Sequence, residues 1–336
     1  MSGAARPGVT IVVSARERFS AAVATIDALY GATSPPFEVV YVDGGSPASV
    51  TRALRARAER HGFTLLRTEQ YLSPDDARNL GFARVRTPYV VFLDNDVVVA
   101  PGWLDALLGC AEETGAAIVG PVYCIDRPVH TKVHMLGGVA HVEEHGGRRL
   151  FIEEHSAMYR SVAQLPPTLS RTPTEQAEFH CMLVRSETMR ALGPLDARFC
   201  GVPESQIDLC LAARERGERV FVEPAALVTY DRPRRLRAYD VPYFLWRWSR
   251  DRCERGLEHF SSRWRLAPDD PYVTRQLHFM ASHRHRALRG FPPLVPLWLG
   301  LRVLGRPRRF RIAERLVALG ASLVREPATP PVSPPV

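Results

Sequence analysis

Two carboxylates stand one residue apart at the end of an apolar run, a place where such residues often bind metal ions. Residues 89–93 read Tyr-Val-Val-Phe-Leu, and Asp94-Asn95-Asp96 follow directly. A short run rich in β-branched and aromatic residues is typical of a buried strand, and open α/β sheets bind ligands at the carboxyl ends of their strands. Mg²⁺ and Mn²⁺ prefer carboxylate oxygens together with substrate phosphates. The pattern therefore indicates a metal-diphosphate site, with a polar turn as the alternative.

Other polar residues are expected to reach the same edge of the sheet. Asp43 ends a second apolar run, Arg78 lies in the first turns of a helix, and Glu204 and Asp208 begin a later helix. A nucleotide-sugar needs a polar group for its base, a metal and a cation for its diphosphate, and a carboxylate that takes a proton from the acceptor hydroxyl. This set offers each of these groups and favours the metal site over the turn.

Strands and helices alternate over the first ~120 residues. Ser73-Pro74-Asp75-Asp76 is a strong helix start, because it combines an N-cap hydroxyl, a proline at the first helical position and two acids at the positive end of the helix dipole. Such alternation predicts an α/β fold with a doubly wound, mostly parallel sheet flanked by helices. The apolar runs that predict its first strands lie at 9–13, 37–42, 63–66 and 89–93.

The region that follows is less regular. Residues 123–174 show little periodicity, and we expect an irregular excursion there that contains a hairpin. Its histidines lack the spacing of a helical metal-binding pair, so we interpret them as exposed or hydrogen-bonded. These histidines are His130, His134, His141 and His145. Regular structure returns with a strand at 181–184, a helix from Ser186, a helix from about Glu204 to Arg216 and two strands at 220–222 and 226–228.

Beyond residue 233 the composition shifts to tryptophan, tyrosine and arginine. We expect a helical appendage packed on the main domain. A membrane-surface element is the alternative, because the arginines at 306–311 follow a leucine-rich stretch that begins at 291. The proline-rich tail is expected to be disordered. The chain is thus divided into a main domain at 1–233 (a nucleotide-binding half at 9–122 and an acceptor half at 123–233), a helical region at 234–326 and a tail at 327–336.

Composition limits the class of protein without naming a partner. The chain has 336 residues, of which 46% are hydrophobic and 24% charged, as in ordinary globular proteins. Its formal charge of +8 is carried by arginine, since Lys132 is the only lysine, and suits any anionic partner. The six cysteines show no Cys-x-x-Cys pair and predict reduced thiols in a cytosolic protein. With no signal-like N-terminus or long apolar run, we expect a cytoplasmic protein, with the inner membrane face as an alternative location.

Taken in order, these motifs resemble the family 2 glycosyltransferases of the GT-A fold, which are inverting and nucleotide-sugar dependent. The resemblance runs from about Val9 to Pro233. Each motif alone is weak, but their order and spacing are specific. The matching stretches are Val9–Ser14, Val42–Ser46, Ala77–Gly81, Phe92–Asp96, Cys181–Arg185, Gly193–Asp196 and Ile207–Leu211.

The resemblance implies roles for individual residues. By position, Asp43 binds the nucleobase, Asp94 lies near the ribose, Asp96 binds Mn²⁺ or Mg²⁺, and Arg78 faces the diphosphate, with an ordinary surface arginine as its alternative. To donor binding we further assign the positions beside these motifs, Ser14, Arg16 and Asn95.

Two departures from the family pattern concern the catalytic base and the metal. The family has a Glu-Asp pair three and two residues before the position of Asp208, whereas this chain has Ser205 and Gln206 there. We favour Glu204 as the base with Asp208 in support, although one residue is a rotation of ~100° on a helix, and we keep Glu178 as a third candidate. The second departure is at Thr229-Tyr230-Asp231, where many relatives carry a metal-binding histidine; Asp231 or water would replace it.

The expected reaction is a single displacement. The base deprotonates an acceptor hydroxyl, which attacks the anomeric carbon opposite the departing nucleoside diphosphate. Two alternatives stay open: a nucleotidyltransferase that acts on a sugar phosphate, and a relative without catalysis that binds sugar. We expect a nucleotide-sugar donor, a hydroxyl acceptor on a glycan, a lipid-linked sugar or a small molecule, peripheral membrane contact only through the C-terminal region, and no nucleic acid.

Overall fold

The computed structural model describes residues 8–232 and 236–289, together with Ile312 and Arg315. The predicted tail at 327–336 and most of the basic, leucine-rich stretch at 291–324 lie outside the described residues. The strands are β1 Val9–Ser14, β2 Glu38–Gly44, β3 Thr64–Thr68, β4 Tyr89–Asp94, β5 Val97–Val99, β6 Ile118–Ile125, β7 Val133–Met135, β8 Gly138–His145, β9 Arg148–His155, β10 Thr172–Thr174, β11 Cys181–Arg185 and β12 Val220–Tyr230.

Nine α-helices are described in these residues, with short 3₁₀ turns at 162–164, 197–199 and 238–240. Their bounds are α1 Ala22–Ala32, α2 Ala48–His61, α3 Pro74–Phe82, α4 Trp103–Thr114, α5 Ser186–Leu192, α6 Glu204–Glu215, α7 Val241–Arg247, α8 Arg250–Arg263 and α9 Pro271–Arg289.

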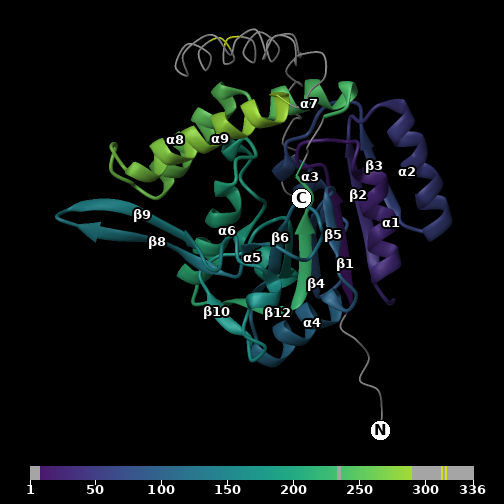
Figure 1. Cartoon of the computed structure of the whole chain (residues 1–336), viewed down its shortest axis with the longest axis horizontal. Helices are drawn as coiled ribbons and strands as arrows, with labels where there is room; N and C mark the ends of the chain where they lie inside the picture. The colour runs from purple at the N-terminus through teal and green to yellow at the C-terminus, as the bar shows by residue number, and fades with distance from the viewer. Residues whose placement is uncertain (1–7, 233–235, 290–311, 313–314, 316–336) are drawn as a thin grey trace.

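A mixed, mostly parallel sheet runs through the middle of the molecule (Figure 1). Its strand order is β10-β12-β6-β11-β4-β1-β2-β3, with β5 and β7 attached to β12 and β6. β1 pairs in parallel with β2 and β4, whereas β11 is antiparallel to both of its neighbours, β4 and β6. The predicted α/β fold is confirmed. The two strands expected at 220–222 and 226–228 are instead one strand, β12, whose register shifts between Glu223 and Leu227.

Helices cover both faces of the sheet, as a doubly wound fold requires. Alternate residues of each strand pack in opposite directions: Ile11 and Val13 of β1 face the helices α1, α2 and α4, whereas Val12 faces α3, α5 and α6. Two layers of core therefore enclose the sheet. β4 is buried along its whole length, Asp94 included.

Local chemistry places α3 tightly against the sheet. The hydroxyl of Ser73 accepts a hydrogen bond from the amide of Asp76 at 3.1 Å and caps the helix as predicted. A Cβ atom at Gly81 would lie 2.3 Å from Cγ1 of Val12, so glycine is what allows α3 to approach β1 this closely. The first turns of α3, which carry Arg78, are thereby held at the carboxyl edge of the sheet.

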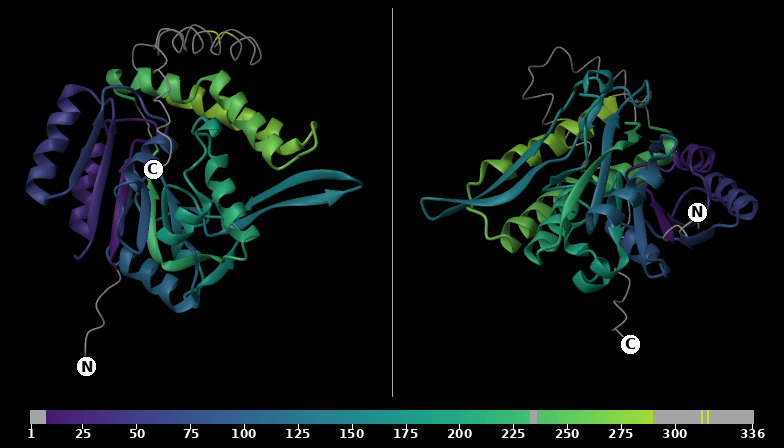
Figure 2. Two further views of the ribbon diagram at one scale, coloured as in Figure 1. Left: turned by 180° about the vertical axis from the view of Figure 1, so that it is seen from behind. Right: turned by 90° about the horizontal axis from the view of Figure 1, so that it is seen from below.

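The stretch predicted to be irregular does contain a hairpin. β8 and β9 pair along their whole length and extend away from the body of the protein (Figures 1 and 2). All four histidines there bond to protein groups as expected: His130 to Thr229, His141 to Glu175, His145 to Glu143 and His134 to Glu178. The partner of His134, which lies in β7, is the buried residue Glu178.

The described part of the C-terminal region is helical, as predicted, and docks on the sheet. α7, α8 and α9 lie together across one end of the molecule (Figure 1). The carboxylate of Asp240 accepts hydrogen bonds from the amides of Phe19 and Ser20, and Glu17 accepts hydrogen bonds from Trp248 and His283. The loop after β1 is therefore tied to the C-terminal helices. Among the described residues, no helix has the length and apolar character needed to cross a membrane.

Candidate active site

The carboxyl end of β4 carries a group of three potential metal ligands. Ligand atoms of Asp94, Asp96 and His180 lie within 4.8 Å of one another, and all three residues are buried. Asp94 and His180 are brought together by the sheet itself, since β4 and β11 pair antiparallel with Leu93 opposite Cys181. Two carboxylates and an imidazole form a donor set that suits Mn²⁺.

Asp96 is the acid of this group whose carboxylate accepts no hydrogen bond. Neither of its carboxylate oxygens accepts a hydrogen bond, although the residue is only 2% exposed, and Nε of Arg18 lies 3.8 Å away. Burial raises the pKa of the Asp96 carboxyl to about 8, against the opposing effect of Arg18. A buried carboxylate that lacks donors is costly unless a cation occupies the adjacent space. Asp96 therefore fits the metal-ligand role expected of it.

Asp94 contacts the guanidinium of Arg78 on one side and the imidazole of His180 on the other. Nη2 of Arg78 donates to its Oδ1 at 2.7 Å, and Nδ1 of His180 lies 3.0 Å from its Oδ2. Burial by itself would raise the pKa of Asp94, but Arg78 and His180 hold it below its ordinary value. Arg78 is 4% exposed, so it is a buried residue of the site and not a surface arginine. Arg16 also approaches Asp94, with Nε at 3.7 Å from Oδ2.

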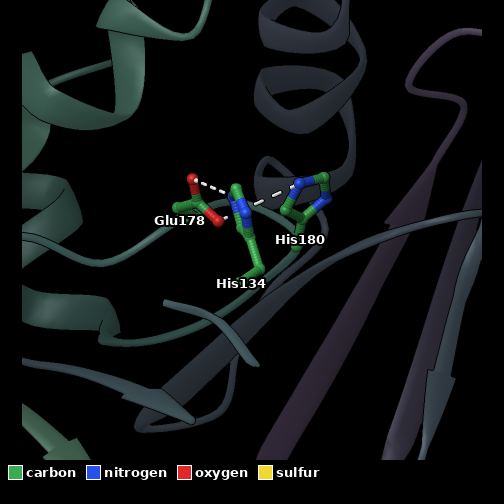
Figure 3. Close-up of side chains that lie close together, drawn as sticks. All are labelled: His134, Glu178 and His180. Carbon is green, nitrogen blue, oxygen red and sulfur yellow. Dashed lines mark hydrogen bonds and ion pairs between the residues drawn. The ribbon is translucent and has the colours of Figure 1, made fainter. Parts of the chain in front are cut away.

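Glu178 lies beside the metal-ligand group and close to His134 and His180 (Figure 3). Nε2 of His134 is 3.2 Å from its Oε1, and Nε2 of His180 is 3.9 Å from its Oε2, which has no hydrogen-bond partner. Burial alone would raise the pKa of Glu178, but the charge and hydrogen bond of His134, with His180 and His155, hold it below its ordinary value. The carboxylate is therefore ionised and has one oxygen free.

The two acids favoured as catalytic base from the sequence lie elsewhere. α6 begins at Glu204, whose carboxylate is buried and accepts a hydrogen bond from the hydroxyl of Tyr272 at 3.0 Å. Burial raises the pKa of Glu204 to about 7. Asp208, one turn further along α6, binds Arg263 and the indole of Trp264. The structure thus does not bring Glu204 and Asp208 to Asp94, and their catalytic roles stay predictions.

Two of the remaining donor-binding candidates, Asp43 and Asn95, already form hydrogen bonds with other groups of the protein. Asp43 accepts hydrogen bonds from Ser46, Thr51 and Arg67. The amide of Asn95 donates to the carbonyl of Arg18 at 2.8 Å, so it fixes the loop after β1. Ser14 lies opposite Asp94 in the sheet, with a buried and unpartnered hydroxyl.

Asp231, the expected substitute for a metal-binding histidine, faces outward. Its carboxylate pairs with Arg127 at 3.1 Å, while its amide donates to the carbonyl of Asp96. In the described residues His180 supplies the imidazole near the acids instead. Reasoning from the sequence missed His180 and His134, because no local spacing links them to Asp94 or to Glu178. The pairing of β11 with β4, which the sequence does not state, is the signal that would have found His180.

A cavity of about 440 Å³ opens onto part of this site, although Asp96 is not among its lining residues. Arg16, Arg78, Asp94, Glu178 and His180 line it from the sheet edge. The opposite wall comes from α6, which contributes Ser205 and Gln206, and from the C-terminal region, which contributes Arg247, Tyr272, Phe279 and His283. In the part of the chain that the structure describes, Glu204 and Asp208 are not among the residues that line the cavity. The geometry is that of a metal and anion site with a buried carboxylate at its side.

Residues 10–163 match the sequence profile described as glycosyl transferase family 2. The chain carries a family 2 glycosyltransferase domain. The predicted family is confirmed by this domain. The kind of fold is confirmed as well, because the chain is similar in structure to the crystal structure of GalNAc-T7 with UDP, GalNAc and Mn²⁺, with a TM-score of 0.52 and 11% identity over 81% of this chain and 57% of that one.

Two curated proteins resemble the family 2 domain and the residues after it. The Pre-mycofactocin glycosyltransferase of Mycobacterium tuberculosis is 27% identical over 238 residues, 70% of this chain and 45% of its own length. The uncharacterized protein y4gI of Sinorhizobium fredii is 27% identical over 266 residues, 77% of this chain and 28% of its own length. The chain thus spans less than half the length of these relatives.

Proposed function

We propose that this chain transfers a sugar from a nucleotide-diphosphate donor to an acceptor hydroxyl, with inversion at the anomeric carbon. The observation that carries the proposal is Asp96, a buried acid whose oxygens accept no hydrogen bond, just after the end of β4 in a family 2 glycosyltransferase domain. The activity named for the mycobacterial relative supports the same class of reaction.

Asp94, Asp96 and His180 would hold the divalent cation. When bound, a Mn²⁺ or Mg²⁺ ion supplies electrostatic stabilisation of the charge that develops on the diphosphate. The GalNAc-T7 structure, which pairs UDP with Mn²⁺, supports Mn²⁺ as the first ion to test. Arg78 fixes Asp94 through its 2.7 Å hydrogen bond, so the ligand carboxylate is oriented before the donor arrives.

Glu178 is the candidate base that the cavity favours. It lies on the cavity wall and is ionised, and His134 orients it through the hydrogen bond to Oε1. The free Oε2 takes the proton of the acceptor hydroxyl as the acceptor oxygen bonds to the anomeric carbon. The bond from that carbon to the diphosphate breaks at the same time, and the nucleoside diphosphate leaves with the electron pair.

We further propose that the helices of the region 234–326 and the domain at 1–233 form one catalytic unit. α7 and α9 supply part of the cavity wall, and Glu17 and Asp240 tie the two regions together. The irregular segment of the acceptor half also contributes to this wall through His134 and His155. The acceptor would enter between these parts.

One departure from the family pattern favours a second candidate function. Ser205 and Gln206 stand on the cavity wall where the family has two acids, and Gln206 accepts a hydrogen bond from the amide of Phe179 instead of serving as a base. The second candidate function is therefore the binding of a nucleotide-sugar without its turnover, since a domain with that function does not need a base at these positions.

The test is release of nucleoside diphosphate from a panel of nucleotide-sugars, with and without Mn²⁺. We expect metal-dependent release from at least one donor and a loss of about a hundredfold or more in Asp96→Asn, because the carboxylate ligand is removed. Asp27→Asn is the matched control, since Asp27 pairs with Arg57 on the surface. Equal release by Asp96→Asn and wild type would contradict the proposal, and donor binding without any release would favour the second function.

A further inference from the structure

A second group of three potential metal ligands lies on the cavity wall, next to Asp94 and Asp96. Its members are His134, Glu178 and His180, and their ligand atoms lie within 4.8 Å of one another (Figure 3). His134 comes from β7, whereas Glu178 and His180 come from the segment that leads into β11. All three line the cavity, so a further coordination position is open to water or a ligand. Two imidazoles and one carboxylate with an open position are a donor set that Zn²⁺ takes in proteins.

The carboxylate of Glu178 offers this group an oxygen that has no donor of its own. Glu178 is 5% exposed, and its Oε2 has no hydrogen-bond partner. Nε2 of His134 is 3.2 Å from Oε1, and Nε2 of His180 is 3.9 Å from Oε2. Tetrahedral Zn²⁺ with ligand bonds of about 2.0–2.1 Å holds its ligand atoms about 3.3 Å apart, so the wider of these gaps needs to close by only roughly 0.6 Å. A buried carboxylate oxygen without a donor is stabilised when a cation fills the space beside it.

Neighbouring groups hold both imidazole rings of this site in place. His180 stacks on Tyr230, with 4.3 Å between the ring centroids. The ring of His134 meets that of His155 edge-on, at 5.1 Å between centroids. Nδ1 of His180 lies 3.0 Å from Oδ2 of Asp94, which leaves Nε2 for an ion. Metal-binding histidines are usually fixed in this way, with the second ring nitrogen held by a carboxylate, so the ligands are oriented before an ion binds.

We propose that His134, Glu178 and His180 bind a Zn²⁺ ion and that this ion inhibits sugar transfer. Imidazole suits Zn²⁺, and a given site of nitrogen and oxygen donors binds Zn²⁺ more tightly than Mn²⁺. The ion takes the free oxygen of Glu178, the candidate base, and so keeps it from the acceptor hydroxyl. It also competes for His180 with an ion at Asp94 and Asp96, because a neutral imidazole has only one nitrogen that can bind a cation. The inhibition rests on the proposed sugar transfer, whereas the binding of the ion does not.

Isothermal titration calorimetry of the full chain with Zn²⁺, at about pH 7.5 where an unperturbed histidine is neutral, tests the site directly. We expect one ion per chain. Affinity should fall by at least about a hundredfold in His134→Ala, since loss of a group that merely orients a ligand already costs about 10- to 100-fold. Glu178→Gln, an isosteric change, should lose affinity in the same way, so a folding defect in one variant does not decide the result.

Asp96→Asn separates this site from the acids at the end of β4. This variant should bind Zn²⁺ within a few-fold of wild type, because Asp96 is not one of the three ligands. Mn²⁺ binding, measured by electron paramagnetic resonance, should show the opposite pattern: it is lost in Asp96→Asn and retained in His134→Ala. Retained Mn²⁺ binding also shows that His134→Ala is folded.

His141→Ala is the matched control. His141 also contacts two glutamates, Glu143 and Glu175, but within the described part of the chain it belongs to no group of three potential ligands that meet so closely. This variant should bind Zn²⁺ as wild type does. The site is overturned if wild type binds no Zn²⁺, if Asp96→Asn loses it, or if His134→Ala binds it as tightly as His141→Ala.

The inhibition is tested in the transfer assay at a fixed Mn²⁺ concentration. Zn²⁺ should inhibit wild type over the concentrations that fill the site in the same buffer, and full activity with the site filled would overturn the inhibition. Absence of transfer with every donor would count against the proposed function alone, because the titrations need no sugar and decide the zinc site by themselves.

Discussion

Nδ1 of His180 lies 3.0 Å from Oδ2 of Asp94, although the two residues are distant in the sequence: Asp94 ends β4 and His180 directly precedes β11, the antiparallel neighbour of β4. His180 also stacks on Tyr230, at 4.3 Å between ring centroids, so its ring cannot turn away freely. We expect His180→Ala to weaken Mn²⁺ binding by at least about tenfold, as the loss of an oriented ligand does. Titration of free Mn²⁺ by electron paramagnetic resonance measures the effect.

His145→Ala provides the comparison for this loss. That histidine bonds to Glu143 at the exposed end of the hairpin and has no contact with Asp94. Mn²⁺ binding should be unchanged in this variant. If His180→Ala retained the wild-type affinity, the ion would be held by carboxylates and donor phosphates alone.

Two isosteric substitutions test whether Glu178 or Glu204 acts as the catalytic base. Glu178→Gln removes the carboxylate on the cavity wall while keeping its size, and we expect sugar transfer to fall by about 10²- to 10⁴-fold, the usual contribution of a general base. Glu204→Gln should retain transfer within a few-fold, because its partner is Tyr272 and not a ligand. Rates at saturating donor and Mn²⁺ measure both. The reverse order of effects would return the role of base to Glu204.

The raised pKa of Glu204 should make the stability of the fold depend on pH. Burial raises its pKa to about 7 in the folded chain, above the ordinary value. The folded state therefore binds a proton that the unfolded state has lost, and the free energy of unfolding decreases as pH rises from about 4.5 to about 7. Glu204→Gln should remove this decrease and unfold at a higher urea concentration than wild type at pH 8. Urea unfolding at pH 5 and pH 8 checks it, and an equal shift at both pH values would contradict the assignment.

Local patterns were enough to predict the parallel half of the fold. Each strand from β1 to β4 is a short apolar run, and the ends of α2 and α3 are marked by Gly62 and Ser73. Gly62 has φ 72°, a backbone conformation that glycine adopts without strain. These signals depend on a few adjacent residues, so the sequence alone carries them.

The candidate site depends on long-range pairing and was predicted only in part. The positions of Asp94, Asp96 and Arg78 follow from strand ends and a helix start, and the structure brings all three together. His180 reaches them because β11 lies antiparallel beside β4. Glu204 does not, because α6 begins at that residue and its carboxylate accepts a hydrogen bond from Tyr272 of α9. Neither event leaves a local mark in the sequence.

Glu17 offers a test of how the C-terminal helices are attached. Its carboxylate is fully buried and accepts hydrogen bonds from Tyr230 at 2.7 Å, Trp248 at 2.9 Å and His283 at 2.7 Å. Burial alone would raise the pKa of Glu17, but His283 and Arg16 hold it well below its ordinary value. The resulting stability is present above pH ~4.5 and is lost as pH falls toward the folded-state pKa.

We expect Glu17→Gln to lower the free energy of unfolding by about 3–5 kcal/mol at pH 7, because it removes one partner of a buried charged network. The variant should also lose part of the wild-type sensitivity to acid, and amide hydrogens of α9 should exchange faster because their anchor to the loop after β1 is weakened. Glu144→Gln is the control, since Glu144 pairs only with Arg149 on the surface and its loss should cost under about 1 kcal/mol. Chemical denaturation with hydrogen exchange measures both. A cost for Glu17→Gln no larger than that for Glu144→Gln would mean that apolar packing of α7 to α9, and not this carboxylate, holds the C-terminal helices on the sheet.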